Sequence, residues 1–362
     1  MGEFDLIKRY FQQPAAAQSV ALSGQDVGIG DDCAVFTPTA GMQLCVSSDM
    51  LVEGRHFLST VSPRALGHKA LAVNLSDLAA CGARPVGFTL ALAMPRVDEA
   101  WLAGFSQGLF GLANLHGCPL IGGDTTQGPL NICITVLGEV PLGAALLRSG
   151  AQLGDDIYIS GAAGQALDMV GMVDMADRAD NASRCVAQHV GQARLALEVF
   201  RGNVSVDAAV FAHARQRMEM PTPRVALGMA LRGVASSAID VSDGLLGDLG
   251  HILRASGVGA DIDTTFTTQL IASYDHMTLT SAKILQKHAL EWCLAGGDDY
   301  ELLFTAPPAA RQALQAIAAS TYTTLTRIGS ITPLLPNQPA LRLLDAKGRP
   351  MPAAFASFDH FA

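Results

Sequence analysis

Residues 63–85 read PRALGHKALAVNLSDLAACGARP. We expect a helix over Pro63–Ala80, because apolar residues recur there with helical spacing. Gly82 then ends it, since glycine accepts the left-handed conformation that follows a last helical turn. Asn74 and Asp77 lie one turn apart within this otherwise apolar segment. The stretch therefore predicts a long helix that carries two polar side chains among apolar ones.

Short runs with the features of β-strands alternate with helical runs on both sides of this helix. The predicted strands are residues 42–47, 86–93, 131–140, 157–160, 237–241 and 300–305. The other predicted helices are residues 98–116, helices between 164 and 201, 222–231, 243–255 and 309–319, with a hairpin through 346–348. These elements do not follow a strict strand–helix–strand rhythm, so we predict the α+β class.

The length of the chain favours two domains. It has 362 residues, which is too long for one comfortable hydrophobic core. The pattern of elements breaks into Arg, Ser and Gly over residues 146–155, so we predict domains of residues 1–150 and 151–362. Hydrophobic residues make up 49% of the chain and charged residues 16%, so a large core can form.

The composition disfavours membrane, secreted and nucleic-acid-binding proteins. The most apolar stretch, residues 129–147, is interrupted by polar residues, proline and glycine, whereas a membrane span needs about 20 nearly uninterrupted apolar residues. Early acidic residues and the lack of an apolar run after a basic start predict no secretory signal and a cytoplasmic location. The net charge of −9 disfavours a nucleic-acid-binding surface. Seven cysteines without a Cys-x-x-Cys pair match neither a disulfide framework nor a zinc ribbon.

Six short acidic motifs recur along the chain. They are Gly30-Asp31-Asp32, Ser47-Ser48-Asp49, Asn74-Leu75-Ser76-Asp77, Gly122-Gly123-Asp124, Asp240-Val241-Ser242-Asp243-Gly244 and Gly296-Gly297-Asp298-Asp299. Each alone has an ordinary explanation, because Gly, Asp and Ser dominate turns and helix caps. Asp49, Asp77 and Asp240, however, adjoin or interrupt apolar segments, where a lone carboxylate is costly unless a cation or a donor neutralises it. Together they indicate a shared metal cluster.

Oxygen ligands of this kind favour Mg²⁺, which usually keeps water and phosphate oxygens in its coordination shell. ATP chemistry therefore fits better than a calcium cage, and no EF-hand spacing is present. The chain has no Gly-x-x-x-x-Gly-Lys-Ser/Thr loop, and the sequence near Gly28 and Gly30 lacks the third glycine of a dinucleotide fingerprint. The common nucleotide-binding folds are thus disfavoured.

The motifs resemble, in this order, those of the thiamine-monophosphate kinase family, which belongs to the PurM-like superfamily that includes aminoimidazole ribonucleotide synthetase. The likeness runs nearly end to end. It is carried by GEFDLI (2–7), GDDCAV (30–35), SD (48–49), EGRHF (53–57), VNLSDLAA (73–80), LIGGDTT (120–126), RSGA (148–151), IDVSDGL (239–245), DYEL (299–302) and FDHF (358–361). One such string would be weak, but the ordered set is specific.

The resemblance implies a two-domain PurM-like architecture. A mixed α/β N-terminal domain would bind ATP and Mg²⁺ and form a homodimer, and a C-terminal α/β domain would complete the nucleotide and substrate site. The implied metal ligands are Asp32, Ser47, Ser48, Asp49, Asp77, Asp124, Asp240 and Asp243. The implied nucleotide contacts are Gly123, Asp124, Arg148 and Ser242, and the implied substrate contacts are His56, Asp298 and Phe355.

The implied activity is the ATP-dependent phosphorylation of thiamine monophosphate to thiamine diphosphate by direct transfer. Positioning and charge neutralisation carry phosphoryl transfer, so several Mg²⁺ ions held mainly by Asp49, Asp77, Asp124 and Asp240 would suffice, and no acid or base is assigned. Two alternatives stay open. One is another ATP-using synthetase of the superfamily, and the other is a non-catalytic protein that binds nucleotide or thiamine phosphate.

Four positions depart from the family pattern. Asp298 stands where the family usually has glutamate, and Met218 stands where it has histidine. Ser106 lies near a position where some members carry an aromatic residue that could stack on adenine. Phe355 replaces a tryptophan, which keeps an aromatic face and loses a hydrogen-bond donor.

Overall fold

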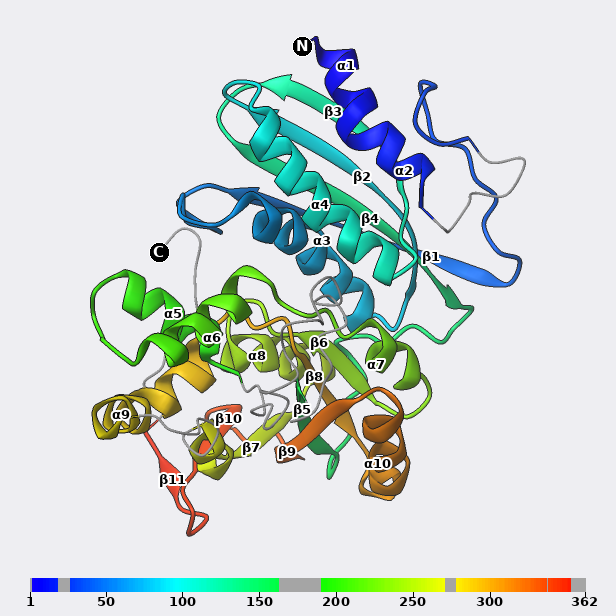
Figure 1. Cartoon of the computed structure of the whole chain (residues 1–362). Coiled ribbons are helices and arrows are strands. Elements are labelled where there is room, and N and C mark those ends of the chain that lie inside the picture. Colours follow the sequence, from blue (N-terminus) through cyan, green and yellow to red (C-terminus); the bar gives the residue numbers. More distant parts are fainter. Residues whose placement is uncertain (1, 19–26, 163–189, 271–277, 337, 353–362) are drawn as a thin grey trace. The chain divides into compact units, whose positions relative to one another are not determined.

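The computed structural model describes residues 2–18, 27–162, 190–270, 278–336 and 338–352 (Figure 1). Contacts divide the chain into two compact units. The first comprises Met1–Ala79 and Ala83–Ala145, and the second comprises Ala80–Gly82 and Leu146–Ala362. This division does not test the functions expected of residues 1–150 and 151–362. The binding of ATP and Mg²⁺ and dimerisation by the first, and completion of the nucleotide and substrate site by the second, stay predictions.

The first unit is built on a four-stranded sheet with the order β1-β4-β2-β3. The strands are β1 (Met42–Val52), β2 (Arg84–Met94), β3 (Leu120–Gln127) and β4 (Asn131–Pro141). β4 pairs antiparallel with β1 and β2, and β3 runs parallel to β2. Alternate residues of β4, such as Ile132 and Ile134, are buried, so one face of the sheet packs on the core.

Two long helices, α3 (Pro63–Ala80) and α4 (Glu99–Leu115), lie along the sheet (Figure 1). Their backbones touch at Gly67 and Gly108, where an added Cβ would lie 2.0 Å from the carbonyl oxygen of Phe105 and 1.8 Å from that of Arg64, respectively. Only glycine allows this approach. Shorter N-terminal elements precede the sheet, namely α1 (Glu3–Ile7), the π-helical segment Lys8–Gln12 and α2 (Gln13–Ala16).

The second unit is built on a seven-stranded sheet with the order β11-β10-β7-β9-β5-β8-β6. Its strands are β5 (Asp156–Ala162), β6 (Ser237–Asp240), β7 (Gly259–Asp263), β8 (Leu302–Ala306), β9 (Thr323–Thr332), β10 (Leu341–Leu344) and β11 (Pro350–Met351). Its helices are α5 (Gln192–Phe200), α6 (Ala208–Glu219), α7 (Val225–Ala230), α8 (Leu245–Ser256), α9 (Leu279–Ala295) and α10 (Arg311–Ser320), with short 3₁₀ segments at Thr264–Leu270 and Pro308–Ala310. All neighbouring strands pair antiparallel except β7 and β10.

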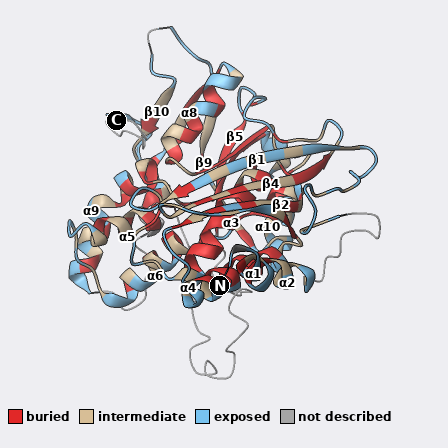
Figure 2. Cartoon of the chain, turned by 90° about the horizontal axis from the view of Figure 1, so that it is seen from above, coloured by how far each residue is buried: buried red, intermediate tan, exposed pale blue. Residues whose placement is uncertain are grey.

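The second unit has two main apolar clusters of buried residues. Figure 2 colours buried residues red. In the first, Leu249 and Ile252 of α8 pack with strand residues such as Leu303, which fixes α8 on the sheet. In the second, α5, α6 and α9 pack together around residues such as Leu195 and Trp292. The acidic motifs of this unit lie at the end of β6, at the start of α8 and in the residues before β8. The sheet and its apolar clusters thus fix their positions.

Several sequence-based predictions of the elements are confirmed and others are corrected. The helix Pro63–Ala80 is found as predicted, and α4 lies between the predicted ends, with Asp98 accepting a hydrogen bond from the Trp101 N–H as its N-cap. β1 extends to Val52 because it pairs with β4 over its whole length. The predicted helices between 164 and 201 lie partly outside the described residues.

The missed elements include β3, β7, β9, α6, α9 and the N-terminal helical segments of residues 3–16. β3 was missed because its Gly-Gly-Asp centre has the composition of a turn, and its pairing with the buried strand β2 is a tertiary effect. Among the helices in the described ranges, none is long and apolar enough to cross a membrane.

Candidate active site

The first unit brings Asp49 and Asp77 together at the free edge of its sheet. Asp49 lies on the edge strand β1, and its backbone N–H donates to Asn74 Oδ1 of α3 at 3.1 Å. Asn74 is itself oriented by donating to the Ala70 carbonyl at 3.0 Å. One turn along α3, the Asp77 carboxylate accepts a hydrogen bond from the Ser47 hydroxyl. The helix predicted from residues 63–80 therefore delivers both of its polar side chains to β1.

The electrostatics of this pair favour a cation. Burial, and then the charge of Asp77, raises the pKa of Asp49 to about 6. Two carboxylates and a serine hydroxyl are hard oxygen donors of the kind that Mg²⁺ binds, so the residues present fit this ion. Within the described residues, no three Asp, Glu, His or Cys side chains gather closely enough to hold a metal ion. Mg²⁺ is usually bound by one or two carboxylates, with water and phosphate oxygens as its other ligands, so two carboxylates are enough protein ligands for this ion.

Ser48 and Asp124 project from the other face of this sheet. Ser48 Oγ lies 3.0 Å from Thr135 Oγ1 and donates to the Ile134 carbonyl at 3.2 Å. The register places Gly123 in one cross-strand row with Asp49. Successive side chains alternate between faces, so Asp124 and Ser48 both point away from the face that Asp49 occupies. The structure therefore does not bring these two side chains to the Asp49–Asp77 pair.

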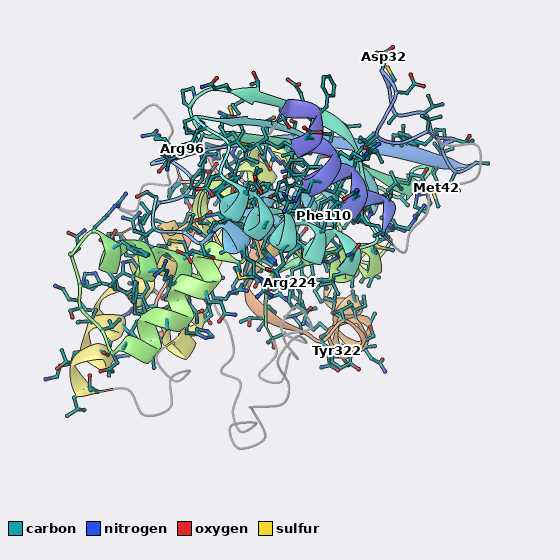
Figure 3. All side chains as sticks on the ribbon, turned by 45° about the horizontal axis from the view of Figure 1, so that its top comes forward. Asp32, Met42, Arg96, Phe110, Arg224 and Tyr322 are labelled. Carbon is teal, nitrogen blue, oxygen red and sulfur yellow. The ribbon has the colours of Figure 1, made fainter. Side chains whose placement is uncertain are left out.

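Asp32 lies apart from that pair as well. It is exposed, and Figure 3 labels it at the tip of a loop. The loop is closed at its base by two backbone hydrogen bonds between Val27 and Val35, of 2.7 and 2.8 Å. The Asp32 N–H donates to the Asp31 carboxylate at 2.9 Å. Its assignment as a metal ligand stays a prediction.

His56 is held in a defined orientation after β1. Its Nδ1 accepts the Val52 N–H at 3.0 Å, so the neutral ring carries its proton on Nε2. The buried Lys69 of α3 donates from Nζ to the His56 carbonyl at 3.1 Å, which fixes the turn from the other side. The half-buried imidazole is therefore fixed with Nε2 as its donor atom.

In the second unit, Asp240 ends β6, and the four residues after it lead into α8. Asp240 is buried, and Ser242 and Asp243 are half-buried. The N–H groups of Ser242, Asp243 and Gly244 all donate to Oδ2 of Asp248, at 3.1, 3.2 and 3.1 Å. Burial and then Asp243 raise the pKa of Asp248 to about 7, while the three N–H groups oppose that rise. Sequence reasoning did not single out Asp248, although its place in the first turn of a helix favours such a cap.

Asp298 lies directly against the Ser242 segment. Its N–H donates to the Ser242 carbonyl at 2.8 Å, and the Tyr300 N–H donates to the Val241 carbonyl at 2.9 Å. Asp298 and Tyr300 have positive φ angles of 65° and 51°. An expected substrate contact and an expected nucleotide contact are thus brought together in one unit.

Glu301, three residues after Asp298, is the centre of a buried ion-pair network. Its carboxylate accepts two hydrogen bonds from Arg224, at 2.7 and 2.5 Å, one from Arg217 at 2.9 Å and one from Ser160 at 2.6 Å. Burial would raise the pKa of Glu301, but Arg224 and Arg217 outweigh it and hold the pKa below its usual value. Figure 3 labels Arg224 within this unit. These charges were not predicted as a group, because their partners are distant in sequence.

Arg148 is exposed near the C-terminal end of α8. Its carbonyl accepts a hydrogen bond from Ser256 Oγ at 3.4 Å, and the same hydroxyl accepts the N–H groups of Gly150 and Ala151 at 3.2 Å each. Burial, then Arg254 and Arg148, lowers the pKa of His251 on the same helix. Arg148 therefore adjoins the C-terminal end of α8, whereas Ser242 precedes its N-terminal end.

Two of the departing positions have structural roles. Ser106 is buried in α4, and its hydroxyl donates to the Tyr10 carbonyl at 2.7 Å. Met218 of α6 is buried in the cluster that includes Leu285 and Trp292. Both positions therefore serve packing in this chain. Phe355 lies outside the described residues, so its expected role stays a prediction.

Comparison with known proteins covers both units. The family described as AIR synthase related protein, N-terminal domain, matches residues 30–140, and its C-terminal domain matches residues 196–334. The thiamine-monophosphate kinase of Salmonella typhimurium is 41% identical over 362 residues, which cover 100% of this chain and 98% of that protein.

Two solved structures share the fold. The thiamine-monophosphate kinase from Stenotrophomonas maltophilia has a TM-score of 0.74 and 38% identity, covering 95% of this chain and 96% of that one. A structure described as AaThiL complexed with AMPPCP and TMP has a TM-score of 0.67 and 23% identity, covering 90% and 89%. The first also supports a shared family, and the second supports the fold.

Proposed function

We propose, because this chain belongs to the thiamine-monophosphate kinase family of AIR synthase related proteins, that it transfers the γ-phosphoryl group of ATP to thiamine monophosphate. The observation in the structure that carries this proposal is the pairing of Asp49 with Asp77 beside the Ser47 hydroxyl. Two carboxylates that repel each other at a sheet edge are suited to a divalent cation that accompanies a nucleotide. Identity over the whole chain supports the choice of substrate.

Asp49 and Asp77 would hold Mg²⁺, with Ser47 as an added oxygen donor. When bound, the ion would neutralise charge on the phosphates and let two anions approach each other. His56 would donate from Nε2 to the substrate, because its Nδ1 is already occupied by Val52. The substrate phosphate is already ionised near neutral pH, so the chain needs no general base, and positioning is its main contribution.

The remaining site assignments are part of the proposal. The further metal ligands are Asp32, Ser48, Asp124, Asp240 and Asp243, the nucleotide contacts are Gly123, Asp124, Arg148 and Ser242, and the substrate contacts include Asp298 and Phe355. The side chains of Ser48 and Asp124 lie on the face of the sheet opposite Asp49, so they would not share an ion with Asp49 and Asp77. Asp240 is buried at the end of β6.

We also propose a homodimer formed through the first unit. Leu44, Val46 and Met50 alternate along β1 on the face away from Asp49 and are 46%, 62% and 52% exposed. Figure 2 colours most of β1 as exposed or intermediate. A row of large apolar side chains on an edge strand is suited to burial against a second copy. Light scattering on the wild type and on Val46→Glu tests this. A monomeric mass for the wild type at micromolar concentration would contradict it.

A cytoplasmic location is proposed as well. The cysteines in the described ranges, six in number, are all free, as is usual in a reducing compartment. ATP as phosphoryl donor is consistent with the same compartment. Fractionation of cells that produce the protein checks the location.

Incubation with ATP, Mg²⁺ and thiamine monophosphate, followed by identification of the product, tests the function. We expect thiamine diphosphate and ADP, and no turnover when thiamine replaces its monophosphate or when a chelator removes the metal. Release of inorganic phosphate with a different acceptor would favour a synthetase of the same superfamily. Binding of ATP without any turnover would favour a non-catalytic role.

A further inference from the structure

The carboxyl group of Asp248, in the first turns of α8, caps the segment before the helix. The N–H groups of Ser242, Asp243 and Gly244 all donate to one oxygen of Asp248, which is only 3% exposed. Free N–H groups at the start of a helix are a common binding place for phosphate. Here the carboxylate of the chain occupies that place. Nucleotide contact at Ser242 must therefore be made by its hydroxyl and not by its backbone N–H.

The carbonyl side of the same segment supports a second segment, residues 296–301. The Ser242 carbonyl accepts the Asp298 N–H at 2.8 Å, and the Val241 carbonyl accepts the Tyr300 N–H at 2.9 Å. The Val241 N–H donates in turn to the Glu301 carbonyl at 2.8 Å. Three backbone hydrogen bonds thus join the two segments.

The conformation of residues 296–301 depends on this support. Asp298 and Tyr300 are held at positive φ angles, which cost a non-glycine residue about 1 kcal/mol or more each. Gly297 has φ 104°, and a Cβ there would lie 2.7 Å from the Ser242 carbonyl oxygen. The two segments are in such close contact that a shift of one displaces the other.

We propose that Asp248 is a positioning residue that fixes residues 241–244 and, through them, residues 296–301, so that Ser242 and Asp298 are placed as one unit. The inference rests on the proposed function, in which Ser242 contacts the nucleotide and Asp298 the substrate. Asp248 itself touches neither. Its loss would therefore weaken the binding of both substrates together.

The far end of residues 296–301 is anchored independently of Asp248. Asp299 accepts the Gly191 N–H with both oxygens, at 2.9 and 3.1 Å, and Glu301 is held by Arg224 and Arg217. The second unit should therefore stay folded when Asp248 is replaced, and the displacement should be confined to the segments that Asp248 holds.

The test compares Asp248→Ala and Asp248→Asn with the wild type. In Asp248→Ala three backbone N–H groups lose their acceptor, and we expect the KM values for ATP and for thiamine monophosphate each to rise about tenfold, because small misplacements weaken contacts strongly. Asn keeps an oxygen in the same place, so Asp248→Asn should recover both KM values to within about threefold of the wild type. Recovery of both KM values together is the result that a positioning role of Asp248 predicts.

Asp156→Asn provides a matched control. Asp156 is equally buried in the same unit, and it accepts hydrogen bonds from Arg311 at 2.7 and 2.9 Å, but it lies at the start of β5 and does not contact either segment. We expect Asp156→Asn to lower the melting temperature and to leave both KM values unchanged. A role of Asp248 in stability alone would produce this same pattern in Asp248→Ala and would overturn the proposal.

The outcomes separate the two hypotheses. A rise in only one KM in Asp248→Ala, or no recovery in Asp248→Asn, would also overturn the proposal of joint placement. An inactive wild type would instead show that the proposed function is wrong. In that case calorimetric titration with ATP and Mg²⁺ decides the role of Asp248: weaker binding to Asp248→Ala than to Asp156→Asn would support it, and equal binding would reject it.

Discussion

Two carboxylate sites, half-buried Asp49 in the first unit and buried Glu301 in the second, have opposite electrostatic surroundings. In the first unit Asp49 faces a second carboxylate, Asp77, and burial and this charge raise its pKa to about 6. In the second unit Glu301 faces Arg224 and Arg217, which outweigh burial and lower its pKa. In the first arrangement two like charges lie close together, and in the second the opposite charges belong to the chain itself.

The difference distinguishes residues that we propose to bind a metal ion from residues that stabilise the fold. Two like charges held close together at a sheet edge repel each other and lower the stability of the folded state. A bound divalent cation offsets this repulsion. A carboxylate that two guanidinium groups bind holds distant segments together, here α6, the start of α7 and β8. Replacing each type should therefore affect different measurements.

The largest effect on stability is expected for Glu301→Gln. The change leaves Arg217 and Arg224 buried without their counter-charge, which should lower the free energy of unfolding by about 3–5 kcal/mol. Denaturant unfolding measures it. Removal of one partner of the exposed pair Arg9–Glu99 is the control and should cost less than about 1 kcal/mol. A loss of that small size in Glu301→Gln would show that the network is not structural.

Asp49→Asn should have the opposite profile. We expect turnover to fall at least about a hundredfold, which corresponds to about 2.7 kcal/mol in the barrier, because one metal-ligand charge is lost. The free energy of unfolding should stay the same or rise, since the repulsion with Asp77 disappears. Turnover measured beside a thermal melt checks both. Turnover close to that of the wild type would remove Asp49 from the proposed metal site.

The pH dependence of stability should show the same contrast on a smaller scale. The pKa of Asp49 is raised from 3.8 to about 6 in the folded state. Between these values the folded state binds more protons than the unfolded state, so the Asp49 contribution to stability falls as the pH rises from about 4 to about 6. In a metal-free buffer the melting temperature of the wild type relative to Asp49→Asn should therefore decline over this range.

Adding Mg²⁺ to the same samples supplies the matched control. The ion should restore the wild type above pH 6 and leave Asp49→Asn nearly unchanged, since binding to the folded state alone adds to stability. A wild type that gains stability over Asp49→Asn as the pH rises in metal-free buffer would contradict the raised pKa.

The smallest effects are expected at Asp298, which has a φ angle of 65°. Aspartate tolerates this left-handed conformation better than glutamate, so Asp298→Glu should lower the free energy of unfolding by up to about 1 kcal/mol. Asp298→Gly should leave it equal or raise it, because glycine adopts positive φ without this cost. If Asp298 contacts the substrate, only the glycine variant raises the KM for thiamine monophosphate strongly. Equal KM values in both variants would remove Asp298 from the site.

The local elements show how far the sequence could predict the fold. The helix Pro63–Ala80 was predicted to the residue, because a long apolar pattern and a following glycine are both local signals. The strand β3 was missed, because two glycines and an aspartate at its centre favour a turn. That segment becomes a strand because it pairs with β2, and β2 is distant from it in the sequence.

The sequence by itself determined the family, the α+β class and the acidic residues for which we propose a magnesium and ATP site. Only the tertiary structure decided which of these side chains meet: Asp49 meets Asp77, Ser48 and Asp124 project from the opposite face, and Asp298 lies on Ser242. The face that a strand residue occupies depends on register, and a buried charge depends on partners that are distant in sequence. The spacing of motifs along the sequence gives neither the strand register nor the partners of a buried charge. The roles of Asp248 and of the Glu301 network could therefore be recognised only in the folded structure.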